Sequence, residues 1–162
     1  MTEPREITTL LVANRGEIAC RIIRTARAMG LRTVAVHSDP DADATFVRLA
    51  DVAVRLGGAA PAESYLRGEA IIDAARRTGA DAIHPGYGFL AENAGFAQAC
   101  ADAGIVFVGP SPDAIERMGS KLGAKRLLAE AGVPVLPDVD ATGLEGAALR
   151  EAAAGVGYPL LV

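Results

Sequence analysis

Strand-like and helix-like segments alternate along the first two-thirds of the chain, and this alternation restricts the possible folds more than any other feature. Residues 8–13 form a short apolar run (TTLLVA), followed by a turn-like Asn-Arg-Gly sequence at 14–16 and helical periodicity over 17–29. Residues 32–37 then have the composition of a second strand. Since consecutive parallel strands are usually joined by a helix, these residues predict a strand-helix-strand unit.

The alternation continues to about residue 108. Further strands are predicted at 52–56, 80–84 and 105–108, and further helices at 45–50, 68–78 and 94–103. Gly30 is placed to end the first long helix, because glycine adopts the left-handed conformation that a helix end requires. This pattern is typical of an α/β fold with a parallel, doubly wound sheet.

The pattern changes after Pro112. Two closely spaced helices are predicted at 113–118 and 121–131, the second with Ser120 as its N-cap, and another helix at 144–155. Residues 158–162 (YPLLV) predict the start of an apolar strand. We therefore expect a first domain over 1–118 and the beginning of a second over 119–162. A chain that stops inside a hydrophobic strand is expected to be part of a longer protein.

Composition excludes several classes of function. The 162 residues have a net charge of −4, and nucleic-acid binding needs clustered excess cations. The sequence contains neither a membrane-spanning apolar run nor a signal peptide, so we expect a cytoplasmic protein. Cys20 and Cys100 lie far apart within predicted helices and are expected to be buried, reduced thiols. Two histidines are too few for a zinc signature, and no metal site is predicted.

Four loops follow the predicted strands, at residues 14–16, 37–40, 84–93 and 109–111, and ligands of such sheets bind at these carboxyl ends. The first loop has one glycine, which disfavours the GxGxxG motif of dinucleotide binding. The 84–93 loop (HPGYGFLAEN) is the most unusual. Its two glycines flank Tyr87, so its backbone is open to a ligand beside a flat aromatic wall. The alternative is a structural turn that buries both of its aromatic residues under the next helix.

Two further features each have two interpretations. Ser120-Lys121 at a helix start combines free N–H groups with a mobile ammonium, which suits a phosphate, but a capped helix with a solvated lysine would have the same sequence. Arg21, Arg24 and Arg27 recur every three residues, which fits either a subunit contact or a solvated helix face.

Taken together, several strings resemble biotin carboxylases, the ATP-grasp component of biotin-dependent carboxylases, and the resemblance spans residues 10–162. The strings are LLVANRGEIACRIIRTARAMG, TVAVHSDPDADATFVRLAD, AESYL, AIHPGYGFLAEN, FVGPSPDAIERMGSK and AGVPVLP. The resemblance is strongest to the N-terminal part of the α subunit of a bacterial acetyl- or propionyl-CoA carboxylase. It implies a Rossmann-like pre-ATP-grasp domain followed by the start of an ATP-grasp domain.

The resemblance also implies a function and a set of site residues. In this family MgATP activates bicarbonate as carboxyphosphate, and the carboxyl group passes to a ureido nitrogen of biotin on a carrier domain, which then serves a carboxyltransferase subunit. Lys121 would bind an ATP phosphate, Tyr87 and Gly88 would lie beside biotin, and Glu92 would line the same cleft. Arg21 and Arg24 would lie at a homodimer contact.

The family's metal-binding carboxylates and bicarbonate-binding cations would follow Val162. The chain therefore contains no expected catalytic residue, and we expect it to be inactive by itself. Two alternatives remain open on the sequence: a non-catalytic binding or dimerisation module with the same fold, and a different ATP-grasp ligase.

Overall fold

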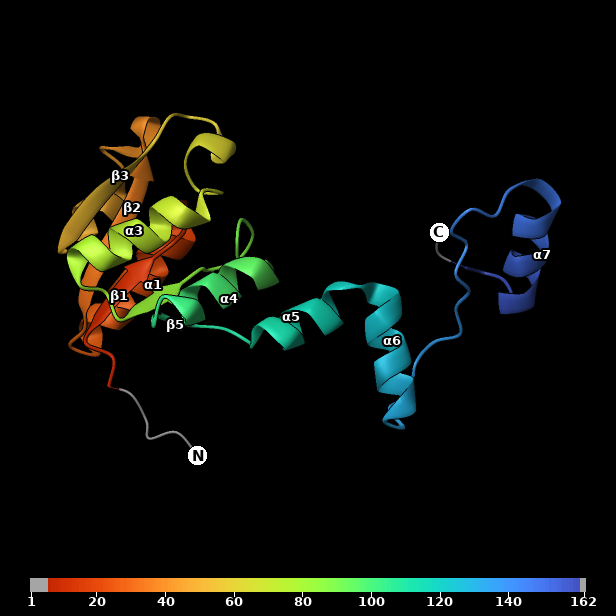
Figure 1. The fold of residues 1–162 in the computed structure, drawn as a ribbon. Coiled ribbons are helices and arrows are strands. Elements are labelled where there is room, and N and C mark those ends of the chain that lie inside the picture. The colour runs from red at the N-terminus through yellow and green to blue at the C-terminus, as the bar shows by residue number, and fades with distance from the viewer. Residues whose placement is uncertain (1–5, 161–162) are drawn as a thin grey trace. The chain divides into compact units, whose positions relative to one another are not determined.

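The computed structural model describes residues 6–160, and the chain divides into two compact units, Met1–Glu116 and Arg117–Val162. A five-stranded parallel sheet forms the centre of the first unit (Figure 1). Its strands lie in the order β3-β2-β1-β4-β5, so the sheet grows outward in both directions from β1. The strands are β1 (Thr9–Val12), β2 (Arg32–Ser38), β3 (Val52–Gly57), β4 (Ala82–His84) and β5 (Val106–Phe107). The predicted parallel, doubly wound sheet is confirmed.

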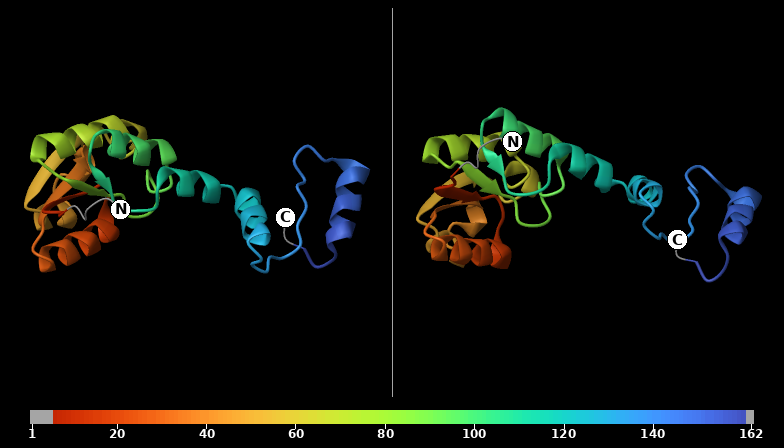
Figure 2. Two further views of the ribbon diagram at one scale, coloured as in Figure 1. Left: turned by 60° about the horizontal axis from the view of Figure 1, so that its bottom comes forward. Right: turned by 90° about the horizontal axis from the view of Figure 1, so that it is seen from below.

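Helices cover both faces of this sheet (Figures 1 and 2). One face packs against α1 (Gly16–Ala28) and α2 (Thr45–Leu49), and the other against α3 (Gly68–Thr78) and α4 (Ala94–Asp102). Two short 3-10 helices, η1 (Asp39–Asp41) and η2 (Pro61–Glu63), interrupt the loops that follow β2 and β3. The first unit is thus a three-layer α/β structure.

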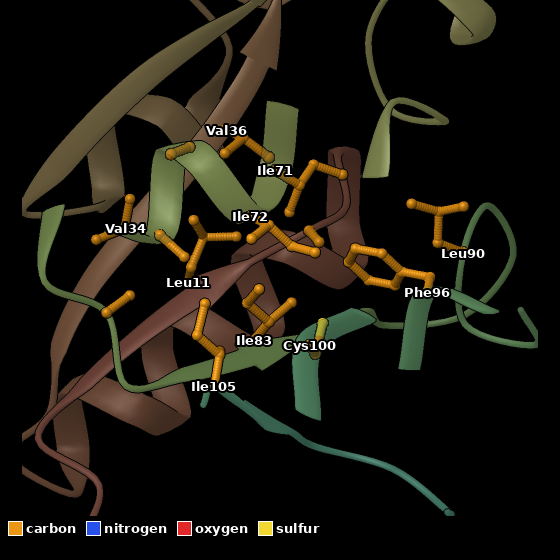
Figure 3. Packing of buried hydrophobic residues seen from close by; sticks show 14 of the residues in the cluster. Leu11, Val34, Val36, Ile71, Ile72, Ile83, Leu90, Phe96, Cys100 and Ile105 are labelled. Atoms are coloured by element: carbon orange, nitrogen blue, oxygen red, sulfur yellow. The ribbon is translucent and has the colours of Figure 1, made fainter. Parts of the chain in front are cut away.

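The alternation of side chains along each strand separates two hydrophobic cores. In β1, Leu11 points toward α3 and α4, where it packs with Val34 and Ile83 (Figure 3). Its neighbours Leu10 and Val12 point to the opposite core, formed with α1 and α2. Because both faces of β1 are buried, the strand is apolar at successive positions, as central strands of parallel sheets are.

The predicted helix ends are confirmed at two positions. Gly30 has a φ of +81° after α1, and the N–H of Leu31 donates to the carbonyl of Ala26, which is the hydrogen bond of a Schellman motif. Ser120 caps α6 (Lys121–Glu130), where its hydroxyl accepts a hydrogen bond from the N–H of Gly123 at 3.2 Å. Both ends therefore follow from local sequence.

Helices α6 and α7 (Gly146–Val156) lie in the second unit. Helix α5 (Pro112–Gly119) begins in the first unit and ends in the second. The prediction of a strand over 158–162 is wrong for residues 158–160, and the last two residues lie outside the described part. A strand needs a hydrogen-bonded neighbour, and residues 117–160 contain no other strand. No helix among the described residues is long and apolar enough to cross a membrane.

Cys20 and Cys100 are both free and buried, as predicted. Burial raises the pKa of the Cys100 thiol from 9.0 to about 11, because the thiolate would lose its hydration. In a Cys20→Ser variant at pH 8, we expect the native Cys100 thiol to react with a disulfide reagent about 100-fold more slowly than in the chain unfolded by guanidinium. Equal rates in the two states would contradict this prediction.

Candidate functional site

The strand order reverses direction between β1 and β4, which pair in the centre of the sheet. Val12 and His84 lie opposite each other at the carboxyl ends of these strands. The chain leaves β1 toward α1 on one face and leaves β4 toward α4 on the other. Such a switch point opens a crevice between the two departing loops, and ligands of doubly wound sheets bind there. The β4–α4 loop, defined here as residues 85–92, forms one side of it.

The side chain of Asn14 joins the two loops at the switch point. It is buried, and its Nδ2 group donates to the carbonyl oxygens of Pro85 at 2.7 Å and Tyr87 at 2.8 Å. Its Oδ1 atom accepts a hydrogen bond from the N–H of Arg15 at 2.9 Å. The end of β1 and the β4–α4 loop are therefore held together by one side chain.

Gly86 lies directly against this side chain. Its φ is +67°, and a Cβ atom at this position would lie 2.8 Å from Nδ2 of Asn14. The N–H of Gly86 donates to Nδ1 of His84 at 3.0 Å. Position 86 thus requires glycine for two reasons, the left-handed backbone and the close approach of Asn14.

The two aromatic residues of the loop have different surroundings. Tyr87 is 61% exposed, and its hydroxyl donates to the carboxylate of Glu17 at the start of α1, which raises the Tyr87 pKa. Phe89 instead stacks on Tyr65, with ring centroids 5.1 Å apart, and has a φ of +42°. The turn that buries both aromatic residues is therefore not formed, because Tyr87 remains exposed to solvent.

A buried carboxylate fixes the loop after β2. Asp41 accepts two hydrogen bonds from the Arg15 guanidinium, both at 2.6 Å, and one each from the hydroxyls of Tyr65 at 2.6 Å and Ser38 at 3.1 Å. These donors favour the charged form, with Arg15 contributing most, and lower the pKa of Asp41 from 3.8 to about 2. The loops after β1 and β2 are joined through this carboxylate.

The residues predicted to form a site lie in three places. Tyr87, Gly88 and Glu92 are exposed in the β4–α4 loop. Arg21 and Arg24 are exposed on α1, where they line one cavity together with Arg15 and Asp41. Lys121 is the first residue of α6 in the second unit, and its side chain lies outside the described part of the structure.

Several residues that organise the site were not identified from the sequence. These are Asn14, Glu17, Asp41 and Tyr65, which connect the loops after β1, β2 and β4. One of them could have been identified from its place in the sequence. Asn14 is the first polar residue after the central strand, at the edge of the sheet where ligands bind. The other contacts span 24 to 70 residues of sequence and depend on the tertiary fold.

The described residues contain no group of three or more His, Cys, Asp or Glu side chains that could hold a metal ion. We therefore assign no Mg²⁺ ligand among the described residues. The surroundings of the β4–α4 loop instead suit a flat, partly polar organic ligand. Gly88 is exposed and has nothing within 4 Å of a Cβ position, so a ligand can approach its backbone beside the exposed Tyr87 ring.

One hydrogen bond of the β4–α4 loop depends on the protonation state of His84. Nδ1 of His84 must be unprotonated to accept the Gly86 N–H, and burial lowers the His84 pKa below its ordinary 6.5. The unfolded chain binds this proton more readily, so stability is full above pH 6.5 and falls as the pH drops toward the folded-state pKa. We expect the His84 ring signals, followed by NMR with a His37→Gln chain for assignment, to titrate with a midpoint below 6.5. A midpoint above 6.5 would contradict a half-buried, neutral ring.

The parallel sheet, with helices on both faces and a glycine-containing loop at its switch point, defines a Rossmann-like, doubly wound α/β domain. The sequence profile of the biotin carboxylase N-terminal domain matches residues 6–115, which is more than half of the chain. The chain therefore belongs to the biotin carboxylase N-terminal domain family.

Known relatives agree with this assignment. The chain is 54% identical over 156 residues to the α subunit of mitochondrial methylcrotonoyl-CoA carboxylase from Oryza sativa, covering 96% of this chain and 21% of the relative. It is 50% identical over 153 residues to biotin carboxylase from Halalkalibacterium halodurans, covering 94% and 34%. Because the relatives come from bacteria and eukaryotes, they do not assign the expected bacterial source.

A solved structure gives the same result. The biotin carboxylase from Campylobacter jejuni, in a complex described as βγ-ATP, superposes with a TM-score of 0.88 at 45% sequence identity. The match covers 95% of this chain and 34% of that one. The chain thus spans about a fifth to a third of the length of these relatives.

Proposed function

We propose that this chain forms the N-terminal part of the biotin carboxylase component of an acyl-CoA carboxylase, which carboxylates carrier-bound biotin with MgATP and bicarbonate. The observation that carries the proposal is the β4–α4 loop, which Asn14 holds at the switch point with Tyr87 exposed beside it. Family membership over residues 6–115 supports it. We assign residues 1–118 to the pre-ATP-grasp domain and 119–162 to the start of the ATP-grasp domain.

The biotin side of the site is assigned to the β4–α4 loop. When bound, biotin supplies the ureido nitrogen that accepts the carboxyl group. The Tyr87 ring offers an apolar surface, and the hydrogen bond to Glu17 restricts the orientation of that ring. Gly88 lets the ligand approach the loop backbone, and we place Glu92 in the same cleft.

The nucleotide side is assigned to the start of α6. Free N–H groups at a helix start and the positive end of the helix dipole favour phosphate, and Lys121 would add a cation there. The described residues contain no group of three or more His, Cys, Asp or Glu side chains that could hold a metal ion, and the proposal assigns no metal ligand among them. It also assigns no residue that moves a proton in the reaction.

The partners follow from the same proposal. A biotin carboxyl carrier domain would present biotin to the loop, and a carboxyltransferase subunit would use the product. The exposed Arg21 and Arg24 on α1 are proposed to contribute to a homodimer contact. The cytoplasmic location stays a prediction, because several relatives are named as mitochondrial proteins.

A chimera tests the proposal. Residues 1–162 replace the matching segment of the Halalkalibacterium halodurans biotin carboxylase, to which 153 residues are 50% identical. We expect biotin-dependent ATP hydrolysis within about tenfold of the unmodified relative. In the chimera, Lys121→Ala is expected to raise KM for ATP, and Tyr87→Ala to raise KM for free biotin. A folded chimera without biotin-dependent activity would overturn the proposal.

The chain of 162 residues is predicted to be inactive by itself, since the described residues contain no metal-binding cluster to support phosphoryl transfer. With MgATP, bicarbonate and free biotin, its rate of ATP hydrolysis should equal that of its Lys121→Ala variant. The unmodified chimera serves as the positive control for the assay. A biotin-dependent rate above that of the variant would show that the chain alone is catalytic.

A further inference from the structure

Asn14 is the side chain that connects the central strand to the backbone of the β4–α4 loop on both sides of Gly86. We propose that Asn14 is a positioning residue, which holds residues 85–87 so that Tyr87 and Gly88 face the ligand in a fixed arrangement. This inference rests on the proposed function, because it assigns to Asn14 a role in binding biotin through the loop.

The hydrogen bonds of Asn14 leave its side chain one orientation. An asparagine side chain has two N–H donors and one carbonyl acceptor. In this chain Nδ2 donates to two carbonyl oxygens, of Pro85 and Tyr87, while Oδ1 accepts from the N–H of Arg15. Both ends of the amide are therefore used, and a flipped amide would lose all three hydrogen bonds.

Asn14 also follows the buried central strand of the sheet. It follows Val12 and Ala13, which are fully buried, and the N–H of Ala13 continues the pairing with β4 by donating to the carbonyl of His84 at 2.9 Å. Because this side chain follows a paired central strand, the loop that it contacts is fixed in position relative to that strand. Residues 85 and 87 of the loop are thus held by a side chain at the end of the sheet.

The far side of the loop has an independent attachment. Phe89, with its positive φ of +42°, stacks on Tyr65, and the hydroxyl of Tyr65 donates to the buried carboxylate of Asp41. A positive φ at a non-glycine residue persists only where the surroundings hold it. Tyr87 and Gly88 therefore lie between two fixed points, and their backbone is presented to solvent with little freedom.

The substitution Asn14→Asp tests the role of the Nδ2 donors. It keeps the acceptor for the N–H of Arg15 but places a carboxylate oxygen against the carbonyls of Pro85 and Tyr87, which repel it. Asn93→Asp is the matched control. Asn93 caps α4, where its side-chain oxygen accepts a hydrogen bond from the N–H of Phe96 at 2.8 Å, and aspartate preserves this acceptor.

In the 162-residue chain, we expect Asn14→Asp to speed hydrogen exchange of the Gly86 amide about tenfold or more, whereas Asn93→Asp leaves it unchanged. In the chimera, Asn14→Asp should raise KM for free biotin about tenfold and leave KM for ATP within about twofold. A general loss of structure would instead change both constants. If Asn14→Asp prevents folding, Gly86→Ala disturbs the same contact from the loop side, with the same selective rise expected in KM for biotin.

The outcomes separate the two proposals. Unchanged exchange at Gly86 in the Asn14→Asp chain overturns the positioning role and leaves the proposed function standing. An inactive unsubstituted chimera overturns the proposed function, while the exchange measurement still decides whether Asn14 holds the loop. Faster exchange at Gly86 with an unchanged KM for biotin would show that Asn14 does not position a biotin site.

Discussion

Replacing Asp41 with asparagine is expected to lower the free energy of unfolding by about 2 kcal/mol. Asp41 is buried and accepts four hydrogen bonds, two from Arg15 and one each from Tyr65 and Ser38. The substitution removes the charge and directs an amide group at donors that need an acceptor. Arg15 is half exposed and regains water, which keeps the loss below that of a fully buried ion pair. Urea denaturation of the 162-residue chain measures it.

Asp39→Asn is the matched control, because Asp39 lies in the same short helix and also binds an arginine through two hydrogen bonds. Arg55 donates to it at 2.6 and 2.9 Å, but both side chains are exposed. The two aspartates differ in burial and in the two further hydrogen bonds that Asp41 accepts from Tyr65 and Ser38, and we expect Asp39→Asn to leave stability nearly unchanged. Equal losses for the two variants would show that neither burial nor these two hydrogen bonds determine the contribution of Asp41.

The same carboxylate gives a pH dependence with a definite sign. Its pKa is lowered from 3.8 to about 2, so the unfolded chain binds a proton more readily than the folded chain between these values. The stabilisation is complete above about pH 4 and is lost as the pH falls through 2, amounting to about 2 kcal/mol. The Asp41→Asn chain should lack this part of the acid dependence.

Replacing Gly86 with alanine is expected to cost about 3 kcal/mol of stability, since two unfavourable effects add. The backbone at Gly86 has a φ of +67°, which strains any residue with a Cβ atom. The added methyl group would also lie 2.8 Å from Nδ2 and 3.1 Å from Cγ of Asn14, which is buried and has no free space to move. The loss is measured by denaturation of the full chain.

Gly88→Ala separates the two effects. Gly88 has a nearly identical φ of +69°, but nothing lies within 4 Å of its Cβ position. Only the backbone strain remains, and we expect a loss of about 1 kcal/mol. If the two alanine variants lose the same stability, the close contact between Gly86 and Asn14 is not present in solution.

The sequence predicted the strands and the sheet well because the central strands are buried on both faces. A segment such as residues 10–13 is then apolar at successive positions, and the turn-like sequence and helix that follow mark its end. The loop of residues 84–93 was identified for a related reason: ligands bind where strands end, and two glycines beside Tyr87 are unusual there.

Contacts between loops that are distant in the sequence could not be predicted from the sequence alone. Asp41 is one of several acidic residues near β2, and only the tertiary structure shows that it is buried against Arg15 and Tyr65 while Asp39 is exposed. The failed strand prediction at residues 158–160 has a different physical reason. Apolar composition predicts burial, but strand formation depends on a neighbouring strand, which residues 117–160 do not supply.

We propose that the β4–α4 loop forms the biotin side of a carboxylase site, and a crystal structure of the chimera with bound biotin would test this assignment. We expect the ureido ring to lie in contact with the ring of Tyr87 and the backbone of Gly88, with Asn14 still bonded to Pro85 and Tyr87. Biotin bound in the chimera without contact to residues 85–92 would contradict it.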